Sequence, residues 1–313
     1  MDSDADKPAV TVVIPCYQQA DFLSDAIESV LGQTFQGWEI IVASGCPESA
    51  TVTRRMIDSH GHPRIRLLEN ASRGVADARN LAIEEARGAL ILPLDADDVI
   101  VPRFLERAVQ AVDPAQRYSI ISTSLQEFGE RRGAWDLPPY SPPGLLASNC
   151  LCVASLFTKA LWRAAGGYDV ALPIGYEDWS FWIACSLLEP QVVQIPERLL
   201  LYRVHARSST SRTAVYDAYM RAMICVAHGD RYPRERVLWA HTVIGDMPDD
   251  ALQLVERRLA HFQEPNLFFF RGLVRERRGD GEGARADYSR ALDRSRRFHW
   301  QAALLLAALA GSI

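Results

Sequence analysis

The sequence predicts an α/β fold with a mostly parallel sheet flanked by helices, followed by an all-α C-terminal region. Up to about residue 100, apolar runs rich in β-branched residues alternate with segments whose apolar residues recur at helical spacing. Strands that alternate with helices in this way favour a parallel sheet buried on both faces. Beyond about residue 213 only helical spacing recurs. Because 313 residues suit two domains of about 150 residues each, we place the domains at residues 8–212 and 213–313.

The N-terminal half contains four expected strands and the helices that connect them. The first strand, residues 10–14, is the run Val-Thr-Val-Val-Ile and ends at Pro15. Asp21 is a candidate N-cap for the helix that follows. The second strand, residues 39–43, ends in the turn sequence Ser-Gly-Cys-Pro. The remaining expected elements are helices at residues 22–31, 50–59 and 76–86 and strands at residues 65–68 and 89–94.

The C-terminal region is expected to be helical throughout. Within it, small and aromatic residues at spacings of 7, 5, 4 and 3 resemble one tetratricopeptide repeat: Gly272, Gly279, Ala284, Tyr288 and Ala291. The alternative is a generic helical appendage. A repeat array would offer a surface for a peptide, a partner protein or self-association into a homo-oligomer. The expected helices are residues 215–229, 234–244, 249–262, 266–278, 282–294 and 300–309.

Composition excludes several classes of protein. The net charge of −5 argues against a nucleic-acid partner, and no run approaches the ~18 apolar residues of a membrane span. Peripheral association with a membrane stays open. The acidic N-terminus is unlike a secretory signal, and the cysteines form no Cys-x-x-Cys pair, so we expect a cytoplasmic protein. Neither a Gly-x-Gly-x-x-Gly fingerprint nor a Gly-x-x-x-x-Gly-Lys phosphate loop is present.

The most informative segment is Leu-Asp-Ala-Asp-Asp at residues 94–98, because it follows the apolar run 89–93. Chemistry in open α/β sheets is concentrated at the carboxyl ends of strands. Asp95 and Asp97 are two residues apart, so in an extended segment their side chains point to the same side. Crowded carboxylates repel one another unless a cation binds among them. The alternative is an acidic loop that caps the next helix, a role open to Asp98.

Six segments resemble, in order, the signatures of the family-2 glycosyltransferases. They are residues 12–17 (Val-Val-Ile-Pro-Cys-Tyr), 72–80 (Ser-Arg-Gly-Val-Ala-Asp-Ala-Arg-Asn), 94–98, 166–169 (Gly-Gly-Tyr-Asp), 176–179 (Tyr-Glu-Asp-Trp) and 202–205 (Tyr-Arg-Val-His). The resemblance covers about residues 8–210. It implies the GT-A fold, a nucleotide-sugar donor, Mn²⁺ or Mg²⁺ as cofactor, and sugar transfer with inversion at the anomeric carbon.

The resemblance also implies roles for individual residues. For the metal it implies Asp97, together with Asp95 and His205. The alternative for His205 is a structural role, as is usual for a lone histidine. For the donor it implies Pro15, Tyr17, Ser44, Arg73, Arg79, Asp95 and Ala96.

Residues 177–182 open an apolar helix that the resemblance places on the acceptor side. It implies Asp178 as the general base, with Glu177 as runner-up; acids in a first helical turn are also favourable for structural reasons alone. Trp179 and Trp182 could form a stacking wall for an acceptor sugar or belong to the core.

One departure from the family pattern concerns the nucleotide. Members usually carry two Asp residues after the second strand, and this chain has Ala43 and Ser44 there. The expected acceptor for a uracil N–H is missing, so Ser44, backbone groups or Glu48 would have to substitute. We therefore expect a hexosyltransferase that uses a nucleotide sugar and acts on a glycan or glycolipid precursor. A UDP-sugar is the first candidate for the donor. A peptide acceptor bound by the helical tail, and a degenerate scaffold that only binds sugar nucleotides, are the alternatives.

Overall fold

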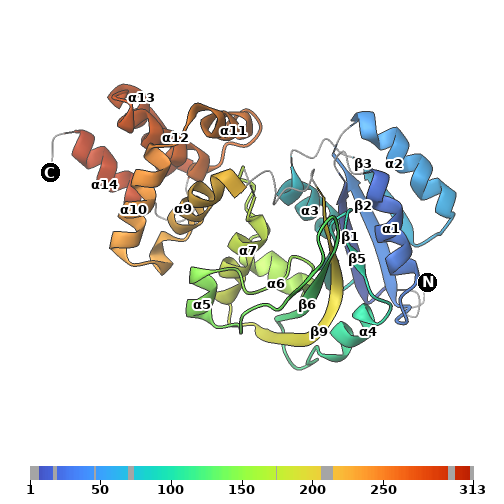
Figure 1. Ribbon diagram of the computed structural model, residues 1–313. Helices are drawn as coiled ribbons and strands as arrows, with labels where there is room; N and C mark the ends of the chain where they lie inside the picture. The colour runs from blue at the N-terminus through green and yellow to red at the C-terminus, as the bar shows by residue number, and fades with distance from the viewer. Residues whose placement is uncertain are drawn as a thin grey trace. The chain divides into compact units, whose positions relative to one another are not determined.

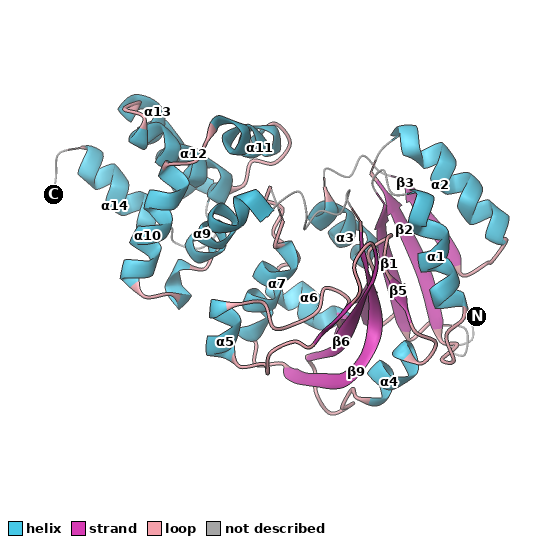
Figure 2. Ribbon diagram, viewed as in Figure 1, coloured by secondary structure: helices cyan, strands magenta, loops and turns pink. Residues whose placement is uncertain are grey.

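The computed structural model describes residues 7–16, 20–45, 47–69, 74–173, 175–205, 214–294 and 300–310. The chain divides into two compact units. The first comprises Met1–Tyr168 and Asp178–Ser208, and the second comprises Asp169–Glu177 and Ser209–Ile313. Strands occur in the first unit, whereas the described C-terminal part is made of helices (Figure 2). The expected domain boundary between residues 212 and 213 lies outside the described residues.

The first unit is built on a mixed sheet with the strand order β3-β2-β1-β4-β8-β6-β9-β5, and β7 pairs with β6. The four expected N-terminal strands are confirmed, and they pair in parallel. The second half of the sheet differs from the expectation, because β8, β5 and β7 pair antiparallel with their neighbours. These three strands are two or three residues long, and β7 returns from its partner β6 through the short turn at residues 130–132. The strands are β1 (Val10–Cys16), β2 (Trp38–Ser44), β3 (Ile65–Glu69), β4 (Leu90–Pro93), β5 (Val99–Ile100), β6 (Ser119–Gly129), β7 (Gly133–Trp135), β8 (Leu156–Thr158) and β9 (Gln191–Val204).

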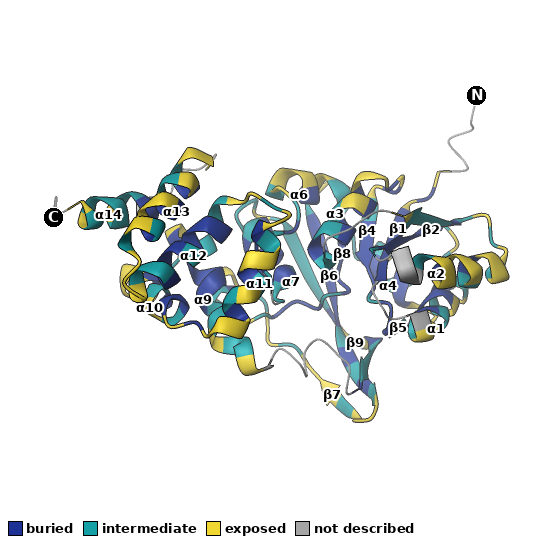
Figure 3. Cartoon of the chain, turned by 90° about the horizontal axis from the view of Figure 1, so that it is seen from above, coloured by how far each residue is buried: buried dark blue, intermediate teal, exposed yellow. Residues whose placement is uncertain are grey.

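Helices cover both faces of this sheet: α1 and α2 lie on one face of β1–β3, and α3 lies on the other (Figure 1). All seven residues of β1 and of β2 are buried, which is why these strands are apolar without alternation. Figure 3 colours the chain by burial, with buried residues such as those of β1 and β2 in dark blue. The helices are α1 (Ala20–Leu31), α2 (Pro47–His60), α3 (Val75–Glu84), α4 (Phe104–Gln110), α5 (Pro142–Ala147), α6 (Lys159–Ala165) and α7 (Glu177–Ser186).

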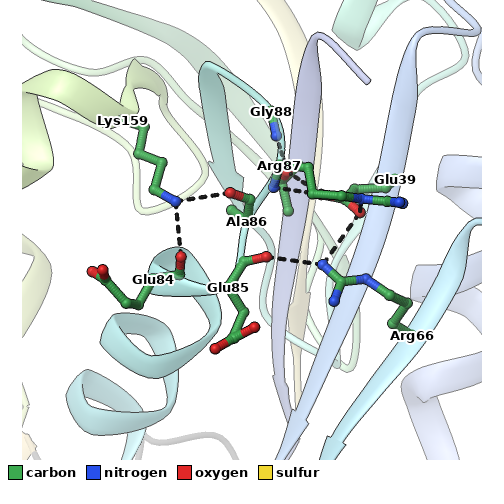
Figure 4. Close-up of polar contacts among 9 residues, drawn as sticks. Glu39, Arg66, Glu84, Glu85, Ala86, Arg87, Gly88 and Lys159 are labelled. Atoms are coloured by element: carbon green, nitrogen blue, oxygen red, sulfur yellow. Dashed lines mark hydrogen bonds and ion pairs between the residues drawn. The ribbon is translucent and has the colours of Figure 1, made fainter. Parts of the chain in front are cut away.

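A buried carboxylate ties the first residues of β1 and β2 to the loop before β4 (Figure 4). Glu39 is fully buried. It accepts hydrogen bonds from the Thr11 hydroxyl (2.8 Å), the Arg87 backbone N–H (2.8 Å) and Arg87 Nε (2.7 Å). Burial raises the pKa of Glu39, but these hydrogen bonds and the charge of Arg66 outweigh it, so the pKa is lowered overall. Gly88 is required here, because a Cβ would lie 2.6 Å from the Thr11 nitrogen.

The C-terminal helices match the six expected segments closely, and each expected helix is confirmed. Gly272 of α12 packs so tightly on α13 that a Cβ would lie 2.5 Å from the Tyr288 ring. Asp287, fully buried, pairs with Arg271 (2.7 Å) and Arg275 (2.9 Å) across the same hairpin. This packing explains the glycine-to-tyrosine spacing, while the repeat assignment itself stays a prediction. The helices are η2 (Ala214–Tyr216), α9 (Asp217–Ala227), η3 (Gly229–Arg231), α10 (Arg234–Gly245), α11 (Asp249–Leu259), α12 (Pro265–Arg277), α13 (Gly281–Arg294) and α14 (Trp300–Leu309).

Across the described residues, we find no helix with the length and apolar character needed to span a membrane.

Candidate active site

The acidic segment forms a tight turn immediately after β4. The Leu94 N–H still donates to the Val13 carbonyl of β1 (2.9 Å), and the Asp98 N–H donates back to the Asp95 carbonyl (3.1 Å). The three carboxylates therefore follow directly on the carboxyl end of a strand in the middle of the sheet. Asp95 is the most accessible, with its side chain 30% exposed against 12% for that of Asp97, and Asp98 is buried.

Asp95 is held by an internal cation. Arg79, on α3, places its guanidinium 2.6 Å from Asp95 Oδ1, and the Arg79 side chain is only 1% exposed. The same guanidinium lies 5.4 Å from the centre of the Tyr168 ring. Arg79 was expected to contact the donor; in this structure it neutralises and orients the carboxylate at the entrance of the turn.

Asn80 joins the second motif of the sequence to the fourth. Its Nδ2 donates to the Tyr168 carbonyl (2.8 Å), and its Oδ1 accepts from the Tyr168 N–H (2.8 Å) and from Trp162 Nε1 (3.0 Å). Gly167 has a φ of +80°, and a Cβ there would lie 2.8 Å from Asn80 Oδ1. Asn80 is the last residue of the motif at residues 72–80. The structure shows that it clamps the backbone that carries the Tyr168 ring.

The end of β9 lies against the acidic turn. His205 Nε2 is 2.9 Å from Asp97 Oδ2. The Arg203 backbone N–H donates to Asp98 Oδ1 (2.8 Å), and its Nε donates to the Asp97 carbonyl (2.8 Å). The Tyr-Arg-Val-His motif and the acidic segment, expected to act together, are therefore in contact. His205 Nδ1 is buried and has no hydrogen-bond partner within the described part of the chain.

The pKa values of two carboxyl groups in this turn are raised. Burial and the neighbouring charge of Asp95 raise the pKa of Asp97, and the contact with His205 only partly offsets them. Burial, followed by the charges of Asp97 and Asp95, raises the pKa of Asp98 well above its ordinary value, against the hydrogen bond from Arg203. Taking the charge off these oxygens is favourable unless a cation compensates it. The turn thus favours binding of positive charge.

The donor set at this turn fits a cation that shares its ligands with a substrate. Within the described ranges, no group of three or more His, Cys, Asp or Glu side chains could hold a metal ion. Asp98 is engaged by Arg203 and Asp95 by Arg79, which leaves Asp97 and His205 as the candidate protein ligands. Mg²⁺ in phosphate-transferring sites is commonly held by one or two carboxylates, with substrate phosphates and water completing the shell. Two protein ligands therefore suffice if a diphosphate supplies others.

The ends of β1 and β2 supply the other expected donor residues. Pro15 pairs with Ala43 and Cys16 pairs with Ser44 in the parallel ladder, so these strand ends are adjacent. Ser44 is 2% exposed, and its Oγ has no hydrogen-bond partner among the residues described. Ala96 is fully buried in the acidic turn. Tyr17, Arg73 and the side chain of Glu48 lie outside the description.

Asp178 has a partner that sequence reasoning missed. Asn149 Nδ2, from the segment after α5, donates to Asp178 Oδ2 at 3.0 Å. Asn149 follows a proline-rich stretch, residues 138–143, and belongs to none of the six motifs. The contact orients the carboxylate that the family pattern indicates as the base. Glu177, the runner-up, is 9% exposed and precedes Asp178 at the start of α7.

The backbone entering α7 is strained. Tyr176 has a φ of +63°, in the left-handed region that residues other than glycine rarely adopt. Gly175, beside it, has a φ of +143°. The Tyr176 hydroxyl donates to Asp217 Oδ1 at 2.6 Å, which helps to hold this conformation. Such strain costs about 1–3 kcal/mol and is concentrated at functional sites.

The two tryptophans of α7 belong to the core. Trp179 is 3% exposed and its Nε1 donates to the Leu145 carbonyl at 2.7 Å. Trp182 is fully buried and its ring centre lies 5.8 Å from that of Phe157. An indole packed on all sides has no face left for a sugar. The expected stacking wall for an acceptor is therefore wrong for Trp182, and Trp179 is buried as well.

Residues 11–154 match the family model for glycosyl transferase family 2. The chain carries a family-2 glycosyltransferase domain. Among curated relatives, the succinoglycan biosynthesis protein ExoO of Rhizobium meliloti is 36% identical over 154 residues, which cover 46% of this chain and 43% of ExoO. The chain covers less than two thirds of the length of three such relatives: 66% of the putative glycosyltransferase EpsE of Bacillus subtilis, 23% of the uncharacterized protein y4gI of Sinorhizobium fredii and 43% of ExoO.

Solved structures show that the fold is GT-A. TarS of S. aureus, residues 1–349, in complex with UDP-GlcNAc, superimposes with a TM-score of 0.58 at 15% identity, covering 92% of this chain and 93% of that one. The mannosyltransferase PcManGT of Pyrobaculum calidifontis, in complex with GDP-Man and Mn²⁺, gives a TM-score of 0.53 at 18% identity, covering 97% and 80%. At these identities the likeness concerns the fold alone.

Proposed function

We propose that this chain is an inverting, metal-dependent glycosyltransferase. It moves a hexose from a nucleotide sugar to a hydroxyl of a glycan or glycolipid precursor. A UDP-sugar is the first candidate for the donor. The proposal rests on one observation: the same domain holds two carboxylates, Asp97 and Asp178, that are each held in place by another side chain. Asp97 lies against His205 in a charge-crowded turn, and Asp178 is held by Asn149 at the start of α7. We place the reaction in the cytoplasm, with peripheral association at the inner face of the membrane for a lipid-linked acceptor.

The donor would lie at the ends of β1, β2 and β4. Asp97 and His205 would hold Mn²⁺ or Mg²⁺, which stabilises the charge that develops on the leaving nucleoside diphosphate. Asp95, fixed by Arg79, would face the donor sugar or ribose. Ser44 supports a nucleobase contact, since its buried hydroxyl has no partner within the described ranges. TarS with UDP-GlcNAc and PcManGT with GDP-Man show that this fold accommodates different bases.

Asp178 would act as the general base. Its carboxylate accepts the proton of the acceptor hydroxyl while the hydroxyl oxygen forms a bond to the anomeric carbon. The bond from that carbon to the diphosphate oxygen breaks at the same time, on the opposite face of the ring. Attack from the opposite face inverts the anomeric configuration. Asn149 keeps the carboxylate in one orientation throughout.

Calorimetric binding of UDP, GDP, dTDP and CDP, with and without Mn²⁺, tests the donor site. We expect one nucleotide to bind in a Mn²⁺-dependent manner, and Asp97→Asn to abolish that binding. Asp58→Asn, which changes an exposed carboxylate on α2, is the matched control and should bind as the wild type does. Absence of binding by all four nucleotides in a folded wild-type protein would contradict transfer and favour a non-catalytic scaffold.

Acceptor-dependent release of nucleoside diphosphate from the nucleotide sugar that binds, followed with candidate acceptors, tests the base. Asp178→Asn should retain nucleotide binding and lose about 100-fold or more in turnover. Full turnover in this variant would remove Asp178 as the base and leave Glu177. Turnover only with peptide acceptors would favour the alternative in which the helical tail binds the acceptor.

A further inference from the structure

The first unit contains a cavity of about 380 Å³ beside an irregularity in the β6–β9 ladder. Thr123 pairs with Ile195, but the next residue, Ser124, pairs with Arg198. Pro196 and Glu197 of β9 therefore have no ladder partners on β6, and a second shift between Ser124 and Leu125 also leaves out Leu199. The bulge opens the ladder, and the volume lies at the lower end of the range of about 300–1,000 Å³ for small-molecule sites.

The cavity wall combines hydroxyls, a neutralised ion pair and apolar surface. Ser122, Thr123 and Ser124 line it from β6. Asp136 and Arg198, also lining residues, form a forked ion pair with contacts of 2.9 and 3.0 Å. Because the guanidinium is already paired, the wall carries no free positive charge for a phosphate. Neutral hydroxyl groups facing apolar patches suit a pyranose ring, which presents hydroxyls at its edge and C–H groups on its faces.

Thr123 carries an unused hydrogen-bonding group. The residue is 1% exposed, and its Oγ1 has no hydrogen-bond partner in the described part of the chain. Most buried polar atoms in folded proteins are hydrogen-bonded, so Thr123 Oγ1, enclosed beside the cavity, is an exception that a ligand hydroxyl reaching it would satisfy. A threonine hydroxyl can both donate to and accept from a sugar hydroxyl.

Two other lining residues connect the cavity to the candidate base. Gln194 Nε2 donates to the Cys150 carbonyl at 2.9 Å, and Ser122 Oγ accepts from the Cys152 N–H at 3.0 Å. The segment they hold begins with Asn149, which contacts Asp178. A single short segment of backbone therefore joins the wall of the cavity to the carboxylate at which the acceptor hydroxyl would lose its proton.

We propose that this cavity binds a neutral sugar unit of the acceptor other than the unit that receives the transferred sugar. The proposal rests on the proposed function, in which the acceptor is a glycan. It makes the bulge of β9 a determinant of acceptor specificity, because a remote sugar bound there fixes which hydroxyl reaches Asp178.

Saturation-transfer NMR on the full chain tests the proposal with three probes: methyl β-D-glucopyranoside, methyl β-D-galactopyranoside and methyl N-acetyl-β-D-glucosaminide. Ser124→Leu fills the cavity and should abolish the signal of the glycoside that binds. Thr123→Val is nearly isosteric and removes only the hydroxyl, so affinity should fall about three- to tenfold. Thr51→Val, at an exposed position of α2, is the matched control and should not change the signal.

Glycoside signals that are equal in all four proteins would overturn the proposal, and so would the absence of signal from all three glycosides in the wild type. Nucleotide binding, measured by calorimetry on the same samples, separates the two hypotheses. Wild-type protein that binds a nucleotide but no glycoside retains the proposed function and loses the cavity site. Protein whose glycoside binding depends on Ser124 but that binds no nucleotide retains the site as a sugar-binding site and loses the transfer function.

Discussion

The ion pair between Arg79 and Asp95 allows a sharp test of how the acidic turn is held. Its contact distance is 2.6 Å, with side chains 1% and 30% exposed. A second pair, Arg54–Glu69, has nearly the same contact distance, 2.7 Å, but its side chains are 55% and 43% exposed. The two pairs differ chiefly in burial, so one serves as the control for the other.

Arg79→Met keeps much of the side-chain volume and removes the charge. It leaves Asp95 next to two further carboxylates without its cation. Removing one partner of a buried ion pair costs about 3–5 kcal/mol. Because the Asp95 side chain is 30% exposed, we expect a loss in the free energy of unfolding at the low end of this range, about 3 kcal/mol. Arg54→Met removes an exposed pair and should cost about 0–1 kcal/mol.

Urea unfolding followed by tryptophan fluorescence measures both losses as changes in the free energy of unfolding. The double variant Arg79→Met/Asp95→Asn should be more stable than Arg79→Met alone, since the unpaired charge is gone. Equal losses in Arg79→Met and Arg54→Met would refute the argument from burial. A double variant no more stable than Arg79→Met would refute the argument from charge repulsion.

Three further predictions concern positioning, pH and packing. Asn149→Ala should lower kcat about 10- to 100-fold with little change in the donor KM, because it removes a hydrogen bond that orients the Asp178 carboxylate without touching the donor site; steady-state kinetics measure this. Glu39→Gln should lower the free energy of unfolding by about 2–3 kcal/mol near pH 7. Because the folded-state pKa of Glu39 is lowered, this difference should shrink as pH falls below about 4 in urea unfolding at several pH values. Gly272→Ala should cost about 1–3 kcal/mol in thermal unfolding, because its Cβ would lie 2.5 Å from Tyr288.

Each of these has a matched control in the same element or environment. Ser148→Ala, at the exposed residue before Asn149, should leave kcat unchanged, and an equal loss there would point to a general effect on the loop. Glu69→Gln, at a half-exposed carboxylate, should show a small difference at every pH. Gly281→Ala places a Cβ with no atom within 4 Å, so a loss as large as at Gly272 would contradict the packing argument.

Much of the architecture could be predicted because it depends on neighbours along the chain. The alternation of apolar runs and helical spacing located β1 to β4 and each C-terminal helix. The position of the acidic segment after an apolar strand also placed its carboxylates at a strand end. The antiparallel β5, β7 and β8 could not be predicted this way, because two or three residues carry too little periodicity.

The sequence by itself determined which residue types stand at the ends of the strands, since strand and helix periodicity are local properties. Only the tertiary structure decided their partners. Asp95 meets Arg79 across 16 residues, Asp178 meets Asn149 across 29, and Asp97 meets His205 across 108. Periodicity shows that one face of a helix is apolar, but not which element covers it. The sequence therefore left open whether Trp182 faces a sugar or the core, and the structure places it in the core. Contacts across such separations depend on how the whole sheet is wound and packed, which no short stretch of sequence encodes.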